Sequence, residues 1–163
     1  MVRVLFVCTG NTCRSPMAET LLRDLIRREN RDDKIITISA GVAAWNDIPA
    51  SCQAQETMKM QGIDLSKHRA RSLTPELVYA ADLVLTMTEA HKQAVLLMVP
   101  EAMGKVHTIR EFAEGETGDV TDPYGASVAE YKRCADEISS YLLKSWEKLQ
   151  KLDRSDEGEI TSA

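Results

Sequence analysis

The sequence predicts a single α/β domain built on a four-stranded parallel sheet with helices on both faces. Four short apolar segments are expected to be strands, and they lie at residues 2–7, 34–39, 82–87 and 105–109. Segments with helical character separate them, and strands that alternate with helices favour parallel pairing through crossover connections. A chain of 163 residues is long enough for one such domain with a sizeable core.

Capping signals help to place the helices between these strands. The first helix is expected at the segment that follows Ser15 and Pro16, because serine caps a helix and proline suits its first turn. Ser127 and Glu130 form a capping box at the start of the last helix. Further helices are expected at residues 50–61, 76–81, 89–99 and 127–149, and loops at 40–49 and 114–125.

The acidic residues near the end of the chain suggest a boundary. We expect residues 1–150 to form the domain, and residues 151–163 to form an acidic, disordered tail because they lack periodicity. The net charge of −5 leaves no basic footprint for nucleic acid. No apolar run approaches the length of a membrane span, and no signal peptide is recognisable. We therefore expect a cytoplasmic protein, acting as a monomer, with neither nucleic acid nor membrane as a partner.

The residues that could bind a metal ion are scattered. Cysteines stand at positions 8, 13, 52 and 134 and histidines at 68, 91 and 107, and no pair of cysteines has the spacing of zinc ligands. We therefore expect no metal and no other cofactor. In a reducing compartment the four thiols are expected to be free, and those at positions 52 and 134 are expected to be structural.

A loop between the first strand and the first helix carries most of the functional information. It begins at Cys8 and reaches Arg14 and Ser15, so that a cysteine and an arginine flank five residues. At a helix N-terminus unpaired backbone N–H groups and the positive end of the dipole favour a bound oxyanion. The same field is expected to lower the pKa of the Cys8 thiol. The remaining residues expected to surround a bound phosphate are Thr9, Gly10, Asn11, Thr12, Cys13 and Ser15.

These residue types suit phosphoryl transfer to a thiol. The guanidinium of Arg14 offers a planar fork of donors for two phosphoryl oxygens. Gly10 is expected to let the backbone turn tightly, and Ser15 to donate to the Cys8 sulfur as it leaves. The alternative for Cys8 is a small apolar residue at the end of a strand, and for the loop a non-catalytic anion cradle.

With these features the chain resembles the low-molecular-weight protein-tyrosine-phosphatase family over residues 1–149. The family's fold is a four-stranded parallel sheet with flanking helices. The resemblance implies that Cys8 is the nucleophile, that Arg14 binds phosphate and that Asn11 orders the loop. It also implies that Cys13 is the partner of Cys8 in a protective disulfide under oxidation. Supporting roles fall on Ser39 and on His68, which is expected to orient the loop and not to act as a base.

The family's general acid belongs to an aspartate-proline pair, which matches Asp122 and Pro123. Such a carboxyl group must protonate the leaving group, and its carboxylate can then activate water against the phosphocysteine. Asp119 lies three residues before it and is expected to be a turn residue. The resemblance thus implies a cysteine-dependent protein phosphatase whose partners are phosphorylated proteins.

Two departures from tyrosine-specific members concern the substrate. Thr12 stands where those members usually carry isoleucine or leucine, and Tyr124 is followed by Gly125 where they tend to have a second aromatic residue. A small polar residue suits a planar guanidinium better than a phenol. The segments at residues 8–19 and 118–125 resemble the bacterial protein-arginine-phosphatase branch of the family. Trp45, expected with Tyr124 at the pocket rim, could stack on either group.

Three alternatives remain open. The first is a tyrosine phosphatase of the same family, with Thr12 a neutral variation. The second is an arsenate reductase, which would need extra redox cysteines around the third strand, and residues 82–91 contain none. The third is a phosphoprotein-binding module, although a binder needs neither the nucleophile Cys8 nor the acid Asp122.

Overall fold

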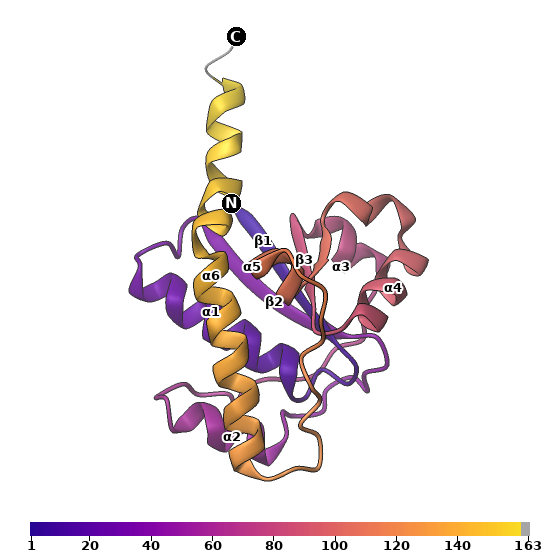
Figure 1. Cartoon of the computed structure of the whole chain (residues 1–163), viewed down its shortest axis with the longest axis vertical. Coiled ribbons are helices and arrows are strands. Elements are labelled where there is room, and N and C mark those ends of the chain that lie inside the picture. The colour runs from indigo at the N-terminus through magenta and orange to yellow at the C-terminus, as the bar shows by residue number, and fades with distance from the viewer. Residues whose placement is uncertain (161–163) are drawn as a thin grey trace.

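Four parallel strands form one sheet at the centre of the computed structural model (Figure 1). The structure describes residues 1–160, and side chains as far as residue 153. The strands are β1 (Val2–Cys8), β2 (Ile35–Gly41), β3 (Leu83–Thr86) and β4 (Val106–Thr108), in the spatial order β2-β1-β3-β4. The predicted fold class is confirmed.

The strand order creates a switch point at the end of β1. β1 pairs in parallel with β2 on one side and with β3 on the other, so the connections that leave these strands diverge there. In open α/β sheets ligands bind outside the carboxyl ends of the strands at such a point. Cys8, the last residue of β1, lies at this place.

Helices cover both faces of the sheet because the side chains of β1 alternate between two cores. Val4 and Phe6 belong to one cluster, which they share with α1, α2 and α6, whereas Leu5 and Val7 belong to the other, which they share with α3 and α4. Figure 1 shows α1 and α6 on one side of the sheet and α3 and α4 on the other. The helices are α1 (Arg14–Arg28), α2 (Cys52–Lys59), α3 (Pro75–Ala80), α4 (Glu89–Met98), α5 (Ile109–Glu114) and α6 (Val128–Ile160), with a 3₁₀ helix at Pro100–Gly104.

Several element boundaries differ from the prediction, among them the start of α1 at Arg14, which leaves Ser15 inside the helix and not at its cap. β2 continues through Ala40 to Gly41, where a loop was expected, because both residues pair with the end of β1. A short helix, α5, begins directly after β4 and was not predicted. Thr108 caps it, since its hydroxyl accepts a hydrogen bond from the backbone N–H of Glu111 at 3.1 Å.

The last helix is also longer than expected. α6 continues past Leu149 to Ile160, where a disordered tail was expected from residue 151. Leu152 packs against the core, and the N-terminal amine of Met1 lies 3.8 Å from the carboxylate of Asp153. The part of the tail at residues 161–163 lies outside the described residues.

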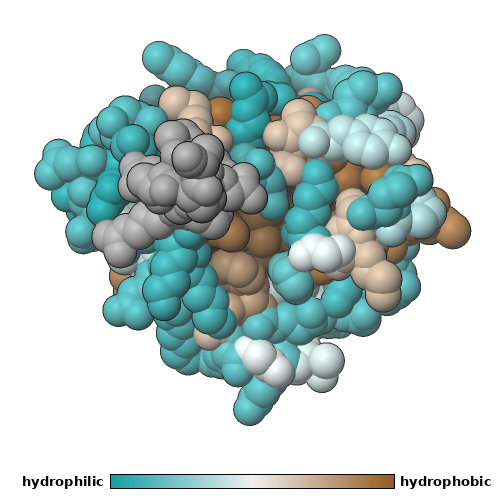
Figure 2. All heavy atoms as spheres, turned by 90° about the horizontal axis from the view of Figure 1, so that it is seen from above, coloured by the Kyte–Doolittle hydropathy of each residue, from teal (hydrophilic) through white to brown (hydrophobic). Residues whose placement is uncertain are grey.

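Figure 2 looks onto the end of the molecule from which α6 projects, and polar side chains dominate it, with apolar ones gathered between them. Within the described residues, no helix has both the length and the apolar character needed to cross a bilayer.

Candidate active site

The predicted nucleophile, arginine and acid line one cavity. The loop at residues 9–13 joins β1 to α1 and curls beneath a cavity of about 230 Å³. Residues from two distant segments of the chain meet there. The cavity is lined by Cys8, Thr9, Gly10, Thr12, Cys13, Arg14, Asp122 and Tyr124. Two segments more than a hundred residues apart in the sequence therefore build this site.

Ser15 is placed to donate a hydrogen bond to the nucleophile. Its Oγ lies 2.8 Å from the Cys8 Sγ, and both side chains are buried. The side-chain amide of Asn11 donates to the same Oγ at 2.8 Å. Because that amide can only donate, the hydroxyl hydrogen of Ser15 is left free to point at the sulfur. A thiolate at Cys8 would thus have a donor in place.

Asn11 holds the loop in an uncommon backbone conformation. Its φ is +55°, the left-handed region that asparagine tolerates better than most residues. Its side chain also donates to the Ser39 Oγ at 2.9 Å and accepts from the backbone N–H of Arg71 at 3.0 Å. The His68 Nε2 donates to the Asn11 carbonyl oxygen at 2.7 Å. The side chains of Ser39 and His68 thus reach the loop through Asn11, and burial lowers the pKa of His68.

The net effect on the pKa of Cys8 is opposite to the one expected. Burial raises the pKa of the thiol, and this outweighs the hydrogen bonds with Ser15, the charge of Arg14 and the backbone hydrogen bond of Asn11, all of which lower it. The loop therefore supplies the groups that oppose the rise in pKa caused by burial, and the hydrogen bond with the Ser15 side chain has the largest effect among them.

Arg14 connects the phosphate loop to the loop that carries the acid. Its guanidinium is almost fully buried and donates to the Val120 carbonyl oxygen at 2.9 Å. A second nitrogen, Nη2, lies 3.6 Å from the Asp122 Oδ2. Val120 is held in turn, because its N–H donates to the carbonyl oxygen of Met87, just past the end of β3, at 2.8 Å. The acid loop is thereby fixed to the sheet.

The two aspartates of that loop have different surroundings. The side chain of Asp122 is half exposed at the cavity, and its Oδ1 accepts from the backbone N–H of Tyr124 at 3.0 Å. Asp119 instead accepts from the backbone N–H of Glu89 at 2.8 Å, at the start of α4. Asp122 can therefore reach a leaving group, while Asp119 caps a helix.

The glycine that the site requires on steric grounds is Gly41, which the sequence analysis did not single out. A Cβ atom there would lie 2.5 Å from the Thr9 carbonyl oxygen and 2.9 Å from the Asn11 nitrogen. At Gly10 a Cβ would touch only the Thr12 hydroxyl, at 3.6 Å. The expected role of Gly10 in a tight turn is therefore not seen, because the positive φ of the loop belongs to Asn11.

His91 is a second residue that the sequence analysis missed. Its Nε2 lies 2.9 Å from the Oγ1 of Thr9, the residue after the nucleophile, while its Nδ1 is buried with no hydrogen-bond partner among the residues that the structure describes. Burial, and then the charge of Arg14, lower its pKa to about 4, against the opposing effect of nearby aspartates. His91 is thus neutral near pH 7. Its place just beyond β3, at the carboxyl edge of the sheet, was a signal that could have identified it.

Tyr131 of α6 reaches the other end of the loop. Its side chain is fully buried, and its hydroxyl lies 3.2 Å from the Cys13 Sγ and 3.4 Å from the Ser51 Oγ. The sequence analysis did not single out Tyr131. Cys13 is a free thiol in the structure, as are the other three cysteines.

A comparison with known protein families identifies the family of this chain. Residues 3–155 match the family model described as low molecular weight phosphotyrosine protein phosphatase. The chain belongs to this family. The resemblance inferred from the sequence is therefore confirmed over almost the whole chain.

Individual relatives of this phosphatase-family chain include arginine phosphatases. A protein-arginine-phosphatase of Bacillus subtilis is 42% identical over 151 residues, which cover 93% of this chain and 98% of the relative. The structure of a YwlE arginine phosphatase mutant with a phosphorylated active-site serine superposes with a TM-score of 0.88 at 40% identity, covering 92% of this chain and 97% of the other. A low molecular weight protein tyrosine phosphatase from T. tengcongensis superposes with a TM-score of 0.86 at 47% identity, covering 91% and 99%.

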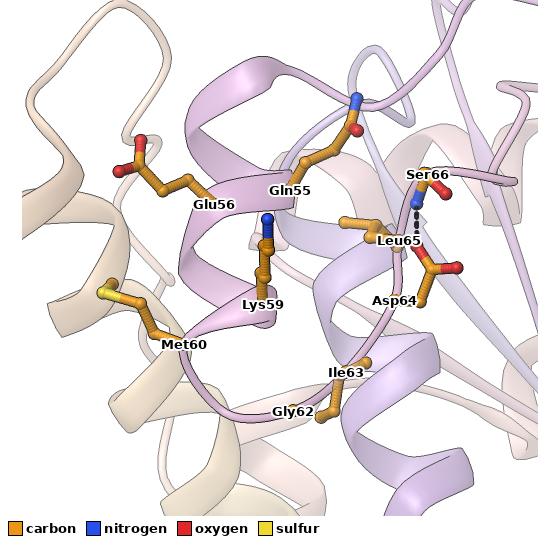
Figure 3. A pocket seen from close by; sticks show the side chains of 9 residues that line it. All are labelled: Gln55, Glu56, Lys59, Met60, Gly62, Ile63, Asp64, Leu65 and Ser66. Carbon is orange, nitrogen blue, oxygen red and sulfur yellow. Dashed lines mark hydrogen bonds between the residues drawn. The ribbon is translucent and has the colours of Figure 1, made fainter.

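A larger cavity of this family member lies elsewhere, between α2 and the segment at residues 62–66 (Figure 3). Its volume is about 960 Å³. The side chains of Glu56 and Lys59 carry opposite charges at its wall, and the Asp64 carboxylate accepts from the Ser66 N–H at 2.9 Å. Neither a cysteine nor an arginine is among its lining residues in the described part of the chain, so size alone does not identify the catalytic site.

Proposed function

We propose that this chain is a protein phosphatase that hydrolyses phosphoarginine in proteins through a phosphocysteine intermediate on Cys8. The observation that carries the proposal is the meeting of Cys8, Arg14 and Asp122 around one small cavity. A module that only binds phosphoproteins would need neither a buried thiol facing the cavity nor a half-exposed carboxyl group above it. The reaction requires no cofactor.

In the first step the Cys8 thiolate attacks phosphorus in line with the leaving nitrogen. The sulfur–phosphorus bond forms as the phosphorus–nitrogen bond breaks, and Asp122 gives its proton to the leaving guanidine nitrogen. Arg14 neutralises charge on the phosphoryl oxygens, together with backbone N–H groups of the loop. Positioning and charge supply most of the catalysis in such a transfer.

In the second step water hydrolyses the phosphocysteine. The Asp122 carboxylate takes a proton from the attacking water, and the sulfur–phosphorus bond breaks. The sulfur leaves as a thiolate that Ser15 stabilises, because its hydroxyl lies 2.8 Å away. Inorganic phosphate is released, and the proton on Asp122 is available for the next cycle.

The substrate preference rests on Thr12 and on the relatives. Thr12 puts a small hydroxyl side chain on the cavity wall, which suits a planar, polar guanidinium, and the proteins of Bacillus subtilis and Geobacillus stearothermophilus named protein-arginine-phosphatase are 42% and 40% identical to this chain. A tyrosine phosphatase is the second candidate. The 47% identity to the T. tengcongensis tyrosine phosphatase supports it, and so does the exposed ring of Trp45.

The test is kcat/KM on phosphoarginine and phosphotyrosine side by side, with Cys8→Ala as the blank. The proposal expects a strong preference for phosphoarginine. A preference for phosphotyrosine would establish the second candidate and make Thr12 a neutral variation. We extend the proposal to a cytoplasmic enzyme acting on phosphorylated proteins, since four free thiols suit a reducing compartment. That it acts as a monomer stays a prediction.

A further inference from the structure

A second cavity, here called the flanking cavity, adjoins the catalytic one. Its volume is about 330 Å³, and it is lined by Gly10, Thr12, Trp45, Ile48, Pro49, Ser51 and Tyr124. Gly10, Thr12 and Tyr124 line the catalytic cavity as well. The two cavities therefore share a wall, and one extended ligand can occupy both.

The flanking cavity presents apolar surface to water. Trp45 is 78% exposed, Tyr124 is 76% exposed and Ile48 is 42% exposed. No charged side chain is among the lining residues. Large apolar side chains gathered at the surface mark a place where another molecule binds. This wall favours an apolar group and offers no ion-pair partner to a charged one.

The segment that carries this wall is already held in place. The Ser51 N–H donates to the Thr12 carbonyl oxygen at 3.0 Å, which ties the segment to the phosphate loop. On its other side Ala70 donates to the Ile48 carbonyl oxygen at 2.7 Å, and Asp47 donates to the Ala70 carbonyl oxygen at 2.8 Å. A preformed wall loses little conformational entropy when a ligand binds.

We propose that the flanking cavity binds an apolar side chain next to the phosphorylated residue of the substrate protein. The inference rests on the proposed function, since a phosphoryl group bound above Cys8 places the substrate backbone near the shared wall. Consecutive Cα atoms of a chain are about 3.8 Å apart, so a residue on either side of the phosphorylated one lies close to the shared wall. A residue beside the phosphorylated one can therefore reach Ile48 and Trp45.

The experiment uses phosphoarginine peptides that differ at one position beside the phosphorylated residue, carrying leucine, serine or glutamate. A matching series with phosphotyrosine is run in parallel. The readout is the ratio of kcat/KM for the leucine peptide to that for the serine peptide, taken within each enzyme. The proposal expects a ratio of about ten, with glutamate no better than serine.

Two variants locate the effect. Ile48→Ser and Trp45→Ala each remove part of the apolar wall and should bring the ratio towards one. Leu97→Ser is the matched control, because Leu97 is 86% exposed and lines neither cavity. That variant should keep the ratio of the unaltered protein.

The outcomes separate the two claims. Turnover of every peptide at the same rate by the unaltered protein would overturn the docking proposal and leave the proposed function standing. A leucine preference that survives both Ile48→Ser and Trp45→Ala would overturn it too. Absence of turnover for all phosphoarginine and phosphotyrosine peptides would overturn the proposed function, and the docking proposal with it.

Discussion

The Ser15 hydroxyl is free to donate to a thiolate at Cys8, because Asn11 donates to its oxygen and does not engage its hydrogen. The Ser15 Oγ lies 2.8 Å from the sulfur and 2.8 Å from the Asn11 amide nitrogen. The three side chains thus form a line of hydrogen bonds that runs from the Asn11 amide through the Ser15 hydroxyl to the Cys8 sulfur. A nucleophile buried at the end of β1 depends on this arrangement, since burial alone raises its pKa.

Ser15→Ala should therefore raise the pKa of Cys8 further. A hydrogen bond to a charged group contributes about 1.5–3 kcal/mol, which corresponds to a shift of about one to two pH units. The midpoint of the curve of alkylation rate against pH, measured for Cys8 with iodoacetamide, should move to higher pH by that amount. Ser145→Ala is the control, because it removes another buried serine hydroxyl, which donates to the Tyr141 carbonyl oxygen within α6. Superimposable profiles for Ser15→Ala and the unaltered protein would contradict this assignment.

Asp122→Asn should slow the reaction most for substrates with a poor leaving group. Loss of a general acid costs about 10²–10⁴-fold in rate, and an acidic phenol needs its proton less than a guanidine does. The measurement is kcat/KM for phosphoarginine and for p-nitrophenyl phosphate in both proteins, because kcat/KM reports phosphocysteine formation and not its hydrolysis, in which Asp122 acts on the same intermediate for either substrate. Asp119→Asn is a matched control, because its carboxylate caps α4 and should affect stability instead. Equal losses for the two substrates would rule out proton donation by Asp122.

Gly41→Ala should damage both stability and activity. The added Cβ would meet two backbone atoms of the phosphate loop, at Thr9 and Asn11, and backbone cannot move aside cheaply. A loss of about 1–3 kcal/mol is expected. Gly104→Ala is the control, since nothing lies within 4 Å of a Cβ there. Urea unfolding of both variants measures the effect. Equal free energies of unfolding for Gly41→Ala and Gly104→Ala would show that the loop backbone shifts without cost to make room for the Cβ.

His91 should make stability depend on pH between about 4 and 6.5. Its pKa is lowered to about 4 in the folded protein, whereas an unfolded histidine titrates near 6.5. Below pH 6.5 the unfolded state binds the proton first, so stability falls as the pH falls and levels off below 4. The loss due to His91 is at most about 3 kcal/mol, and less with solvent screening.

His91→Asn removes this titration. Urea unfolding across that pH range should give a shallower fall for the variant than for the unaltered protein. Parallel curves would show that the folded-state pKa of His91 lies near its ordinary value.

The sequence was most informative where function depends on residues close together in the chain, although the expected turn at Gly10 and the expected direction of the Cys8 pKa shift were wrong. The span from Cys8 to Ser15 predicted a strand, a phosphate loop and a helix because a few residue types dictate all three. Asp122 came from the family resemblance, and no local pattern joined it to Arg14. That pairing depends on the Val120 carbonyl, which only the fold brings to the guanidinium.

The residues that were missed act through contacts distant in sequence. His91 and Tyr131 each meet the loop across roughly 80 residues or more, and neither carries a local motif. Gly41 is required by the backbone of another segment, so its own neighbours gave no sign of it. α6 was predicted too short because the residues after position 150 are mostly polar and lack the apolar periodicity of a packed helix.

The most direct test of the account is to trap the phosphoryl group on residue 8. The Cys8→Ser variant is incubated with a phosphoarginine protein, and peptides from it are examined by mass spectrometry. The account predicts a phosphoryl group on the substituted residue 8, and none when Arg14→Ala is added. Phosphate release by Cys8→Ser at the rate of the unaltered protein, or a phosphoryl group found at another residue, would contradict it.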